Sequence, residues 1–494
     1  MMADRVQELM QRVDDDPLVA LVRKNQPDGE WNLFLVGGTI RDLFIGRPLV
    51  DRDFVVEGDA CEFARSLAAS IGASYVPLEE QWDMVRLVIA QKGKGGQTHC
   101  MHLDFSGLRG TTVQEDLLHR DFTINAMAVH LPKDVCLPPG PLLDPTEGLN
   151  DLEKGIIRAV RHENLVADPL RLLRAFRFSC SLGFTIHQDT KKAVALHAKK
   201  IRTSAGERIR DELMKLLESP FSCSSMSEMD SIGVLGEVFP ELPELKGVDQ
   251  GTHHSHDAWN HSLATLHSLD SLADRGYADL CPWDLAIRND LGKHPQTLPL
   301  LKLAALFHDL GKPSTRSIGD DHQVHFYGHE QRGAQYVLQI AKRLRLSRTQ
   351  QNALYTWVRF HTWPLQLHLA ASRNRLGQRA KVRFFRKMGA HAIGTLILAI
   401  ADEAAKSMPN TSGGHASPLI AFVKSLFGLY YAKDAAGIRK PPLITGHDLI
   451  RHFGLTPGPQ IGGLLEAVHE ARVEGKVCTR QDALAFVTTL LNQG

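Results

Sequence analysis

The 494-residue sequence lacks several features that would place it in a specialised class of protein. Its seven cysteines form no CxxC pair, which fits a reducing compartment better than a disulfide framework. Its apolar stretches, such as residues 394–401, are too short to cross a bilayer, and the polar N-terminus has no signal-peptide core. With 57 Lys and Arg against 56 Asp and Glu, no global basic excess indicates a nucleic-acid partner. We therefore expect a soluble, cytoplasmic, multidomain protein without a membrane segment and without an evident obligate protein partner.

Acidic residues are also absent locally, between Gln331 and Ala401. This stretch contains 13 Lys and Arg, so it can present a basic face to a phosphate backbone. The alternative is a solvated helical surface whose charges are balanced by acidic neighbours in space. The neck region 151–220 has a smaller excess, with 14 Lys and Arg against 9 Asp and Glu, a local charge of +5.

The hydrophobic pattern predicts strands only near the N-terminus. Residues 32–36, 54–56, 84–90 and 102–105 have the short apolar pattern of strands. Beyond the loop at 137–145 the periodicity is helical to the end of the chain, with breaks at 407–418 and 438–446. The sequence therefore predicts an α+β protein with a mixed α/β head and an all-α remainder.

Two features of residues 34–60 indicate phosphate chemistry. The strand at 32–36 runs into Gly37 and Gly38 and then into a helix, an arrangement that lets backbone N–H groups approach a triphosphate. Asp51 and Asp53 are two residues apart at the start of the next strand, so they point to one face. Two such carboxylates suit Mg²⁺, which can activate a hydroxyl and stabilise a diphosphate leaving group. A solvated acidic turn is the alternative for an isolated DxD.

Five motifs in order resemble the class II tRNA nucleotidyltransferase and bacterial poly(A) polymerase family, which has a polymerase-β-like head. They are GGTIRD (37–42), DRDFVV (51–56), LLHRDFTINAMAV (117–129), LLDPTEGLNDLEKGIIRAV (142–160) and ADPLRLLRAFRF (167–178). GERIRDELMKLL (206–217) resembles the last motif of the family's head and neck. The resemblance implies a catalytic head at 1–150, a helical neck that recognises the base at 151–250, and further helical domains at 251–405 and 406–494.

The resemblance also implies roles for individual residues. Asp51 and Asp53 would be the catalytic, Mg²⁺-binding pair. Asp168 and Arg171 would read the edge of the incoming base, so that protein replaces a template. The remaining nucleotide-binding residues that it implies are Gly37, Gly38, Arg41, Asp42, Arg120, Asp121, Asn125, Arg174 and Arg177.

Several of these residues have structural alternatives. Asp168 followed by Pro169 is also a good helix start, with Asp168 as the N-cap. The arginines at 171, 174 and 177 can equally be a surface stripe, and Asp104 can be a third carboxylate near the metals or an ordinary strand residue. The sequence departs from the family pattern at His119, where the first of two paired arginines is expected, and at Ala167, where an acid is expected.

A second constellation combines histidine with aspartate, and 10 of the 24 histidines lie between residues 253 and 329. Imidazole and carboxylate together suit a transition metal such as Mn²⁺ or Ni²⁺. The motifs HDAWNHSLATL, FHDLGKP, YGHE, RFHTWP and AIADEAA resemble, in this order, the HD phosphohydrolase superfamily. The resemblance implies the metal ligands His261, His308, Asp309 and Asp402, with His329 and His361 as accessory groups, and hydrolysis of phosphomonoesters or 2′,3′-cyclic phosphates.

A nucleotidyltransferase head followed by an HD domain looks like the multifunctional CCA-adding enzymes of bacteria. The resemblance implies addition of C and A to tRNA 3′ ends from CTP and ATP. The alternatives are a CC-only or A-only enzyme, a poly(A) polymerase, an HD phosphohydrolase with a nucleotide-binding head, and a non-catalytic RNA-binding protein. The tail at 441–487 also resembles such enzymes, and its helix–turn–helix can contact RNA or simply pack.

Overall fold

The computed structural model describes most of the chain as two compact units. One comprises residues 1–212 with 229–238, and the other comprises residues 213–228 with 239–494. Residues 407–416 of the predicted break at 407–418 and residues 438–441 of that at 438–446 fall outside the described residues, which are 2–79, 83–92, 98–251, 256–320, 322–406, 417–432, 442–473 and 475–492.

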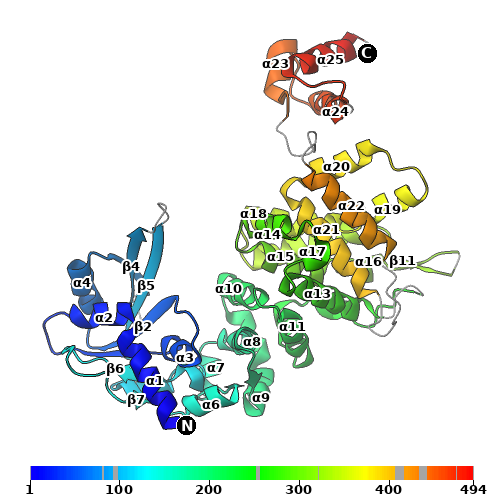
Figure 1. Ribbon diagram of the computed structural model, residues 1–494. Coiled ribbons are helices and arrows are strands. Elements are labelled where there is room, and N and C mark those ends of the chain that lie inside the picture. Colours follow the sequence, from blue (N-terminus) through cyan, green and yellow to red (C-terminus); the bar gives the residue numbers. More distant parts are fainter. Residues whose placement is uncertain are drawn as a thin grey trace. The chain divides into compact units, whose positions relative to one another are not determined.

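The first unit is built on a seven-stranded sheet (Figure 1). The strand order is β3-β4-β5-β2-β1-β6-β7, and only β2 and β5 run parallel to each other. The four strands that we expected from the sequence are confirmed as β1, β2, β4 and β5. The strands are β1 (Asn32–Val36), β2 (Asp51–Glu57), β3 (Ser74–Glu79), β4 (Met84–Lys92), β5 (Thr98–Gly107), β6 (Ala128–His130) and β7 (Leu142–Leu143).

Helices and a core of aromatic side chains stabilise this sheet. Phe54 of β2 stacks on Phe105 of β5, with ring centroids 4.9 Å apart, and Phe63 of α4 packs against Phe105. Asp59 begins α4 by accepting a hydrogen bond from the backbone N–H of Glu62. The helices of the head are α1 (Met2–Asp15), α2 (Pro17–Lys24), α3 (Gly38–Ile45), α4 (Ala60–Ile71) and α5 (Val113–Leu118), with a 3₁₀ turn, η2, at Thr123–Asn125.

Helices follow the head, as the sequence predicts, and the described residues beyond 145 add only two short strand pairs. Two short pairs occur, β8 (Ile156–Ile157) with β9 (Thr185–Ile186) and β10 (Ser317–Ile318) with β11 (Val324–His325). Two-residue strands have no periodicity that a sequence pattern can reveal. The helices between residues 148 and 245 are α6 (Gly148–Lys154), α7 (His162–Ala167), α8 (Arg171–Leu182), α9 (Gln188–His197), α10 (Gly206–Leu217), α11 (Ser222–Ser231) and α12 (Val234–Val238), with η3 at Ala198–Thr203 and η4 at Leu242–Leu245.

The second unit is helical, and α13 packs closely against α15 and α21 in its core. Its last three helices form a separate apolar cluster around Leu449, Val468 and Val487. The helices are α13 (Ala258–Asp274), α14 (Asp284–Gly292), α15 (Thr297–Phe307), α16 (Lys312–Thr315), α17 (His329–Arg343), α18 (Arg348–Phe360), α19 (Trp363–Ser372), α20 (Gln378–Met388), α21 (Ala392–Ala405), α22 (Pro418–Tyr431), α23 (Gly446–Phe453), α24 (Pro459–Val473) and α25 (Arg480–Asn492), with η5 at Ala278–Leu280 and η6 at Gly389–His391.

One helical stretch, Gln378–Ala405, is long and apolar enough to cross a membrane by length and composition alone. Within the fold, 72% of its most apolar window is buried, because α21 packs against α13 and α15. The apolar residues of α21 therefore belong to the protein core.

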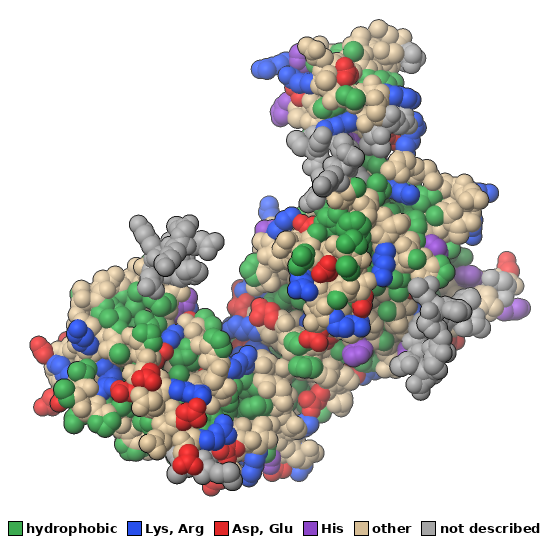
Figure 2. All heavy atoms as spheres, viewed as in Figure 1, with side chains coloured by type: hydrophobic (Ala, Val, Ile, Leu, Met, Phe, Trp, Pro, Cys, Tyr) green, Lys and Arg blue, Asp and Glu red, His purple; other side chains and the backbone are tan. Residues whose placement is uncertain are grey.

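The acid-free stretch 331–401 is partly neutralised by acidic residues outside it. Arg343 donates two hydrogen bonds to Glu241, Arg359 pairs with Glu330, and Arg386 pairs with Glu466. For these arginines the structure favours the balanced helical surface over a phosphate-binding face. On the face of the head visible in Figure 2, basic and acidic side chains are likewise intermixed.

Candidate functional sites

The first site begins where β1 ends in the predicted glycine turn. Gly37 has a φ of +69°, and a Cβ at this position would lie 2.6 Å from Nη1 of Arg120. The position therefore requires glycine both for its backbone conformation and for the close approach of the arginine. No side chain caps the start of α3, so its first backbone N–H groups are left for another acceptor.

Asp51 and Asp53 lie on one face of β2, as their spacing predicts. Arg52, between them, points to the other face and pairs there with the buried Asp16. The backbone N–H of Asp53 donates to Oγ1 of Thr39 in α3, which ties the strand to the glycine turn. Among the described residues, no side chain or backbone N–H donates a hydrogen bond to the carboxylate oxygens of Asp53. These oxygens are therefore free to bind a metal ion.

The parallel strand β5 contributes two more side chains at this point. The register pairs Asp51 with His102 and Asp53 with Asp104. Nδ1 of His102 lies 3.0 Å from Oδ1 of Asp51, and Arg86 of β4 donates to both oxygens of Asp104 at 2.7 Å. Asp104 is thus a third carboxylate beside Asp53, but Arg86 neutralises it.

Burial and charge both act on Asp53. Burial, reinforced by the nearby carboxylates of Asp104 and Asp51 and opposed by Arg120, raises its pKa to about 6. A carboxylate in this setting is stabilised in its charged form by a cation, because a cation replaces the lost hydration and offsets the repulsion. The residues present therefore fit a divalent metal ion.

A network of polar side chains surrounds the glycine turn. Arg41 binds Asp42 through Nε and Nη2, each at 2.9 Å, and donates to Oδ1 of Asn125 at 2.6 Å. Arg120 binds Asp116 at 3.0 Å, which leaves its Nη1 directed toward Gly37. The predicted side chains of Arg41, Asp42, Arg120 and Asn125 are therefore brought together around Gly37 and Gly38.

Asp121 is the buried centre of the connection to the neck. It accepts hydrogen bonds from Asn125 and from Arg174 of α8. Although burial opposes ionisation, Arg174 and Asn125 hold the pKa of Asp121 below its ordinary value. Arg177 pairs with Glu212 at 2.5 Å, so Arg174 and Arg177 face inward and do not form a surface stripe.

Asp168 and Arg171 line a cleft of about 740 Å³ in the first unit. Asp168 follows α7, and α8 begins at Arg171 after a short turn. Oδ1 of Asp168 accepts a hydrogen bond from the backbone N–H of Leu170 at 3.3 Å, so Asp168 caps the turn that leads into α8. Oδ2 of Asp168 accepts a hydrogen bond from Arg208 at 3.0 Å, and Arg171 donates to the carbonyl oxygens of His119 and Asn164. The departures at His119 and Ala167 both lie in the wall of this cleft.

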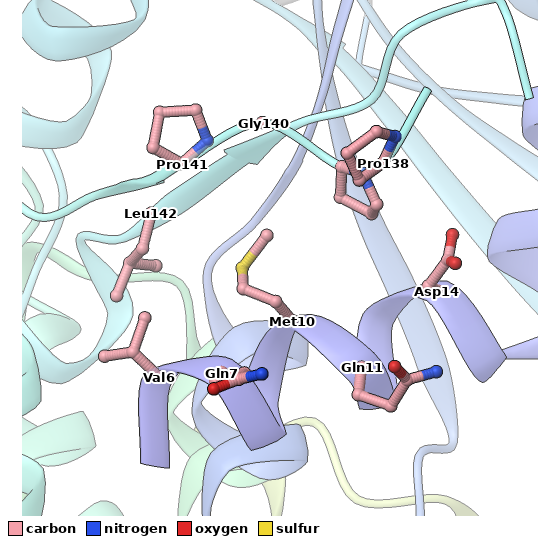
Figure 3. Close-up of a pocket in the computed structure, with 10 residues that line it drawn as sticks. Val6, Gln7, Met10, Gln11, Asp14, Pro138, Gly140, Pro141 and Leu142 are labelled. Carbon is pink, nitrogen blue, oxygen red and sulfur yellow. The ribbon is translucent and has the colours of Figure 1, made fainter. Parts of the chain in front are cut away.

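A second hollow in the first unit lies away from these residues. Figure 3 shows it between α1 and the segment 138–142, with a volume of about 510 Å³. Met10 points into it toward Gly140. Its lining has a single titratable side chain, Asp14, which pairs with Arg23, so it does not contribute to the site described above.

The histidine–aspartate residues converge within the second unit. Nε2 of His261 in α13 lies 2.8 Å from Oδ1 of Asp402 in α21. Nε2 of His308 lies 3.1 Å from Asp309 and 3.7 Å from Asp402. Each of two overlapping groups, His261 with His308 and Asp402, and His308 with Asp309 and His361, has donor atoms within 4.8 Å of one another.

Three of these histidines have the same backbone support. Nδ1 of His308, His329 and His361 each donates, at 2.8 Å, to the carbonyl oxygen three residues earlier. This hydrogen bond leaves the lone pair on Nε2, the atom that faces the cluster. Burial, with His308 and His329 nearby, lowers the pKa of His361 to about 3, so this ring is a neutral donor. The cluster therefore fits a metal ion held by imidazole and carboxylate ligands.

Several residues at the two sites were not identified from the sequence. His102 and Asp104 repeat the i, i+2 spacing of Asp51 and Asp53, so the strand pattern could have indicated His102. Arg86, Glu212 and Arg208 belong to elements that meet the site only through the fold. Nζ of Lys312 lies 2.6 Å from Asp309. The two residues are three apart, so helical spacing in the sequence could have indicated this ion pair.

Comparison with known families matches most of the chain. Residues 33–158 match the poly A polymerase head domain, and residues 183–245 match the RNA- and SrmB-binding site of polymerase A. Residues 258–405 match the HD domain, and residues 437–487 match tRNA nucleotidyltransferase domain 2. The nucleotidyltransferase and HD families are metal-dependent.

Individual relatives cover nearly the whole chain. An A-adding tRNA nucleotidyltransferase of Deinococcus radiodurans is 34% identical over 460 residues, covering 92% of this chain and 94% of the relative. A CC-adding enzyme of Thermus thermophilus is 30% identical, with 92% of both chains covered. The Thermotoga maritima CCA-adding enzyme complexed with tRNA has the same fold, with a TM-score of 0.60, 23% identity and 98% of both chains covered. The resemblance inferred from the five motifs is thus confirmed, and the chain belongs to the tRNA nucleotidyltransferase family.

Proposed function

We propose that this protein is a cytoplasmic, template-independent nucleotidyltransferase that adds C and A to tRNA 3′ ends from CTP and ATP, releasing diphosphate. The observation that carries the proposal is the pair Asp51 and Asp53 on one face of β2, beside the open glycine turn. We also propose the domain limits 1–150, 151–250, 251–405 and 406–494 for the head, the neck, the HD domain and a tail that contacts RNA.

Within the head, Asp51 and Asp53 would hold Mg²⁺, which when bound supplies positive charge to the triphosphate and the attacking hydroxyl. Because Gly37 and Gly38 have no side chains, the guanidinium groups of Arg120 and Arg41 lie close to the backbone at the start of α3, where they would meet the phosphates. Arg41 and Arg120 are held by Asp42 and Asp116, so their remaining N–H groups have fixed directions. Preorganised donors of this kind bind developing negative charge without reorganisation.

Base selection would take place in the cleft lined by Asp168 and Arg171. A carboxylate accepts from the exocyclic amine of cytosine or adenine, and a guanidinium donates to ring nitrogen or carbonyl oxygen. Arg208 and the His119 carbonyl orient the two side chains. Asp121, Asn125, Arg174 and Arg177 would connect this cleft to the triphosphate site.

A single-nucleotide specificity is the second candidate. Two relatives that cover 92% of the chain are an A-adding enzyme and a CC-adding enzyme. The HD domain would in addition hold a transition metal such as Mn²⁺ or Ni²⁺ through His261, His308, Asp309 and Asp402. With His329 and His361 on the substrate side, it would hydrolyse phosphomonoester or 2′,3′-cyclic phosphate ends.

A terminal-addition assay tests the proposal. The protein is incubated with tRNA transcripts that lack the terminal A, the terminal CA or the whole CCA end. Each nucleoside triphosphate is supplied singly. Incorporation of C and then A supports the full activity, and incorporation of only one of them supports the narrower enzyme. Incorporation of UTP, or of long runs of A, contradicts a role in tRNA 3′-end repair.

A further inference from the structure

The three residues between β11 and α17, Phe326 to Gly328, directly precede His329 of the HD site. The carbonyl oxygen of Phe326 accepts hydrogen bonds from both N–H and Nδ1 of His329, at 3.2 and 2.8 Å. Nε2 of the same histidine lies 3.3 Å from Nε2 of His361 and 3.6 Å from Asp309. The backbone of Tyr327 is therefore held at a fixed place, two residues from a side chain of the metal cluster.

Tyr327 exposes its ring at this place. Its side chain is 78% exposed, although burial of an aromatic ring of this size stabilises a folded protein. The ring stacks on that of His325, with centroids 5.0 Å apart and an interplanar angle of 14°. His325 thus covers one face of the ring and leaves the other toward solvent.

Two cationic residues lie on the segments that adjoin this ring pair. Ser317 is the register partner of His325 in the β10–β11 pair, and the exposed Arg316 directly precedes it. On the inner side, Lys312 pairs with Asp309 and lies 5.5 Å from the ring centroid of Phe326. A ligand with one aromatic ring and at least one phosphate has the chemistry that complements this surface.

We propose that Tyr327, supported by His325, is a stacking platform for the terminal nucleobase of an RNA strand whose phosphorylated 3′ end enters the HD site. The proposal rests on the hydrolytic function proposed for that site and deepens it, because it names a nucleotide end as the substrate class. A phosphomonoester without a base would make no use of the exposed ring. Stacking tolerates every base, so the platform accepts any 3′-terminal nucleotide.

Binding is measured with the full-length protein and an RNA trinucleotide that ends in 2-aminopurine 3′-phosphate. Stacking quenches 2-aminopurine fluorescence, so quenching is expected with the wild-type protein and with Tyr327→Phe. Tyr327→Ala is expected to abolish quenching and to weaken binding about 5- to 150-fold, as expected for the loss of one base–aromatic stack. Ile318→Ala, an exposed change in β10 that leaves the ring pair intact, is the matched control and is expected to behave as wild type.

A second measurement separates this proposal from the hydrolytic function. Hydrolysis of adenosine 2′,3′-cyclic phosphate is compared with that of glycerol 1,2-cyclic phosphate, which has no base. Tyr327→Ala is expected to raise KM for the first substrate only and to leave kcat within about twofold. If no hydrolysis occurs but quenching depends on Tyr327, the hydrolytic function fails and the platform stands. Unchanged quenching in Tyr327→Ala, or an equal loss for both substrates, overturns the platform and leaves the exposed ring as a surface for a protein partner.

Discussion

The two candidate metal sites differ in the type of their ligands and in how deeply the ligands are buried. In the head, Asp51 and Asp53 lie side by side on a strand, partly exposed, and Arg86 and His102 supply nearby positive or polar groups. In the HD domain, His308 and Asp309 are each about 1% exposed and come together with residues from distant helices. An open pair of carboxylates leaves room for a triphosphate and an RNA end to share a metal ion. A buried imidazole cluster suits an ion that stays bound between turnovers.

The largest effect is expected from loss of a head carboxylate. Asp53→Asn should lower nucleotide incorporation by at least about a thousandfold, because metal-assisted charge stabilisation contributes several kcal/mol. Radiolabelled CTP and ATP incorporation into tRNA transcripts measures it. Hydrolysis of 2′,3′-cyclic phosphate by the same variant should be unchanged. Extension at the wild-type rate by a variant lacking both Asp51 and Asp53 would refute the metal assignment.

At the HD site we expect the opposite result, in which hydrolysis is lost and nucleotide incorporation is retained. His261→Ala should reduce the retained transition metal and abolish phosphate hydrolysis, while nucleotide incorporation stays within about twofold of wild type. His267→Ala, an exposed histidine on the same helix, is the matched control. Metal content after purification, measured by mass spectrometry, checks the prediction. Equal metal content in both variants would show that His261 is not a ligand.

A smaller effect is expected in the cleft. Arg208→Ala removes the partner of Oδ2 of Asp168, so the carboxylate loses its orientation. We expect the ratio of kcat/KM for CTP to that for ATP to change by about tenfold or less, because both side chains are partly exposed. Arg210→Ala, which changes the exposed ion pair with Asp211 on the same helix, should leave the ratio unchanged.

The smallest effect is on stability. Because the pKa of Asp53 is raised to about 6, its ionised form is disfavoured in the folded protein, and stability is lost as the pH rises through 6 without metal. In EDTA at pH 7.5, Asp53→Asn should therefore exceed wild type in Tm by about 2–4 °C, corresponding to about 1 kcal/mol. At pH 4 the difference should vanish. A pH-independent difference would mean that the substitution acts through packing.

The sequence predicted the local parts of the head site well. The strand, the glycine turn, and the shared face of Asp51 and Asp53 follow from spacing within a few residues. The helix start at Asp168 was predicted to within two residues, because Asp168 caps the turn at Pro169 and Leu170 and α8 begins at Arg171. Arg86 could not be predicted as the partner of Asp104, since the two meet through the β4–β5 register rather than through sequence proximity.

The amino-acid sequence by itself determined which chemical groups this protein has and the short-range geometry that periodicity imposes on them. It also determined the family, because five ordered motifs are a property of the chain alone. Only the tertiary structure decided which cation each carboxylate meets, which histidine nitrogen faces the cluster, and which aromatic ring stays in solvent. These depend on contacts between residues far apart in the chain, and such contacts are set by the packing of whole helices and strands.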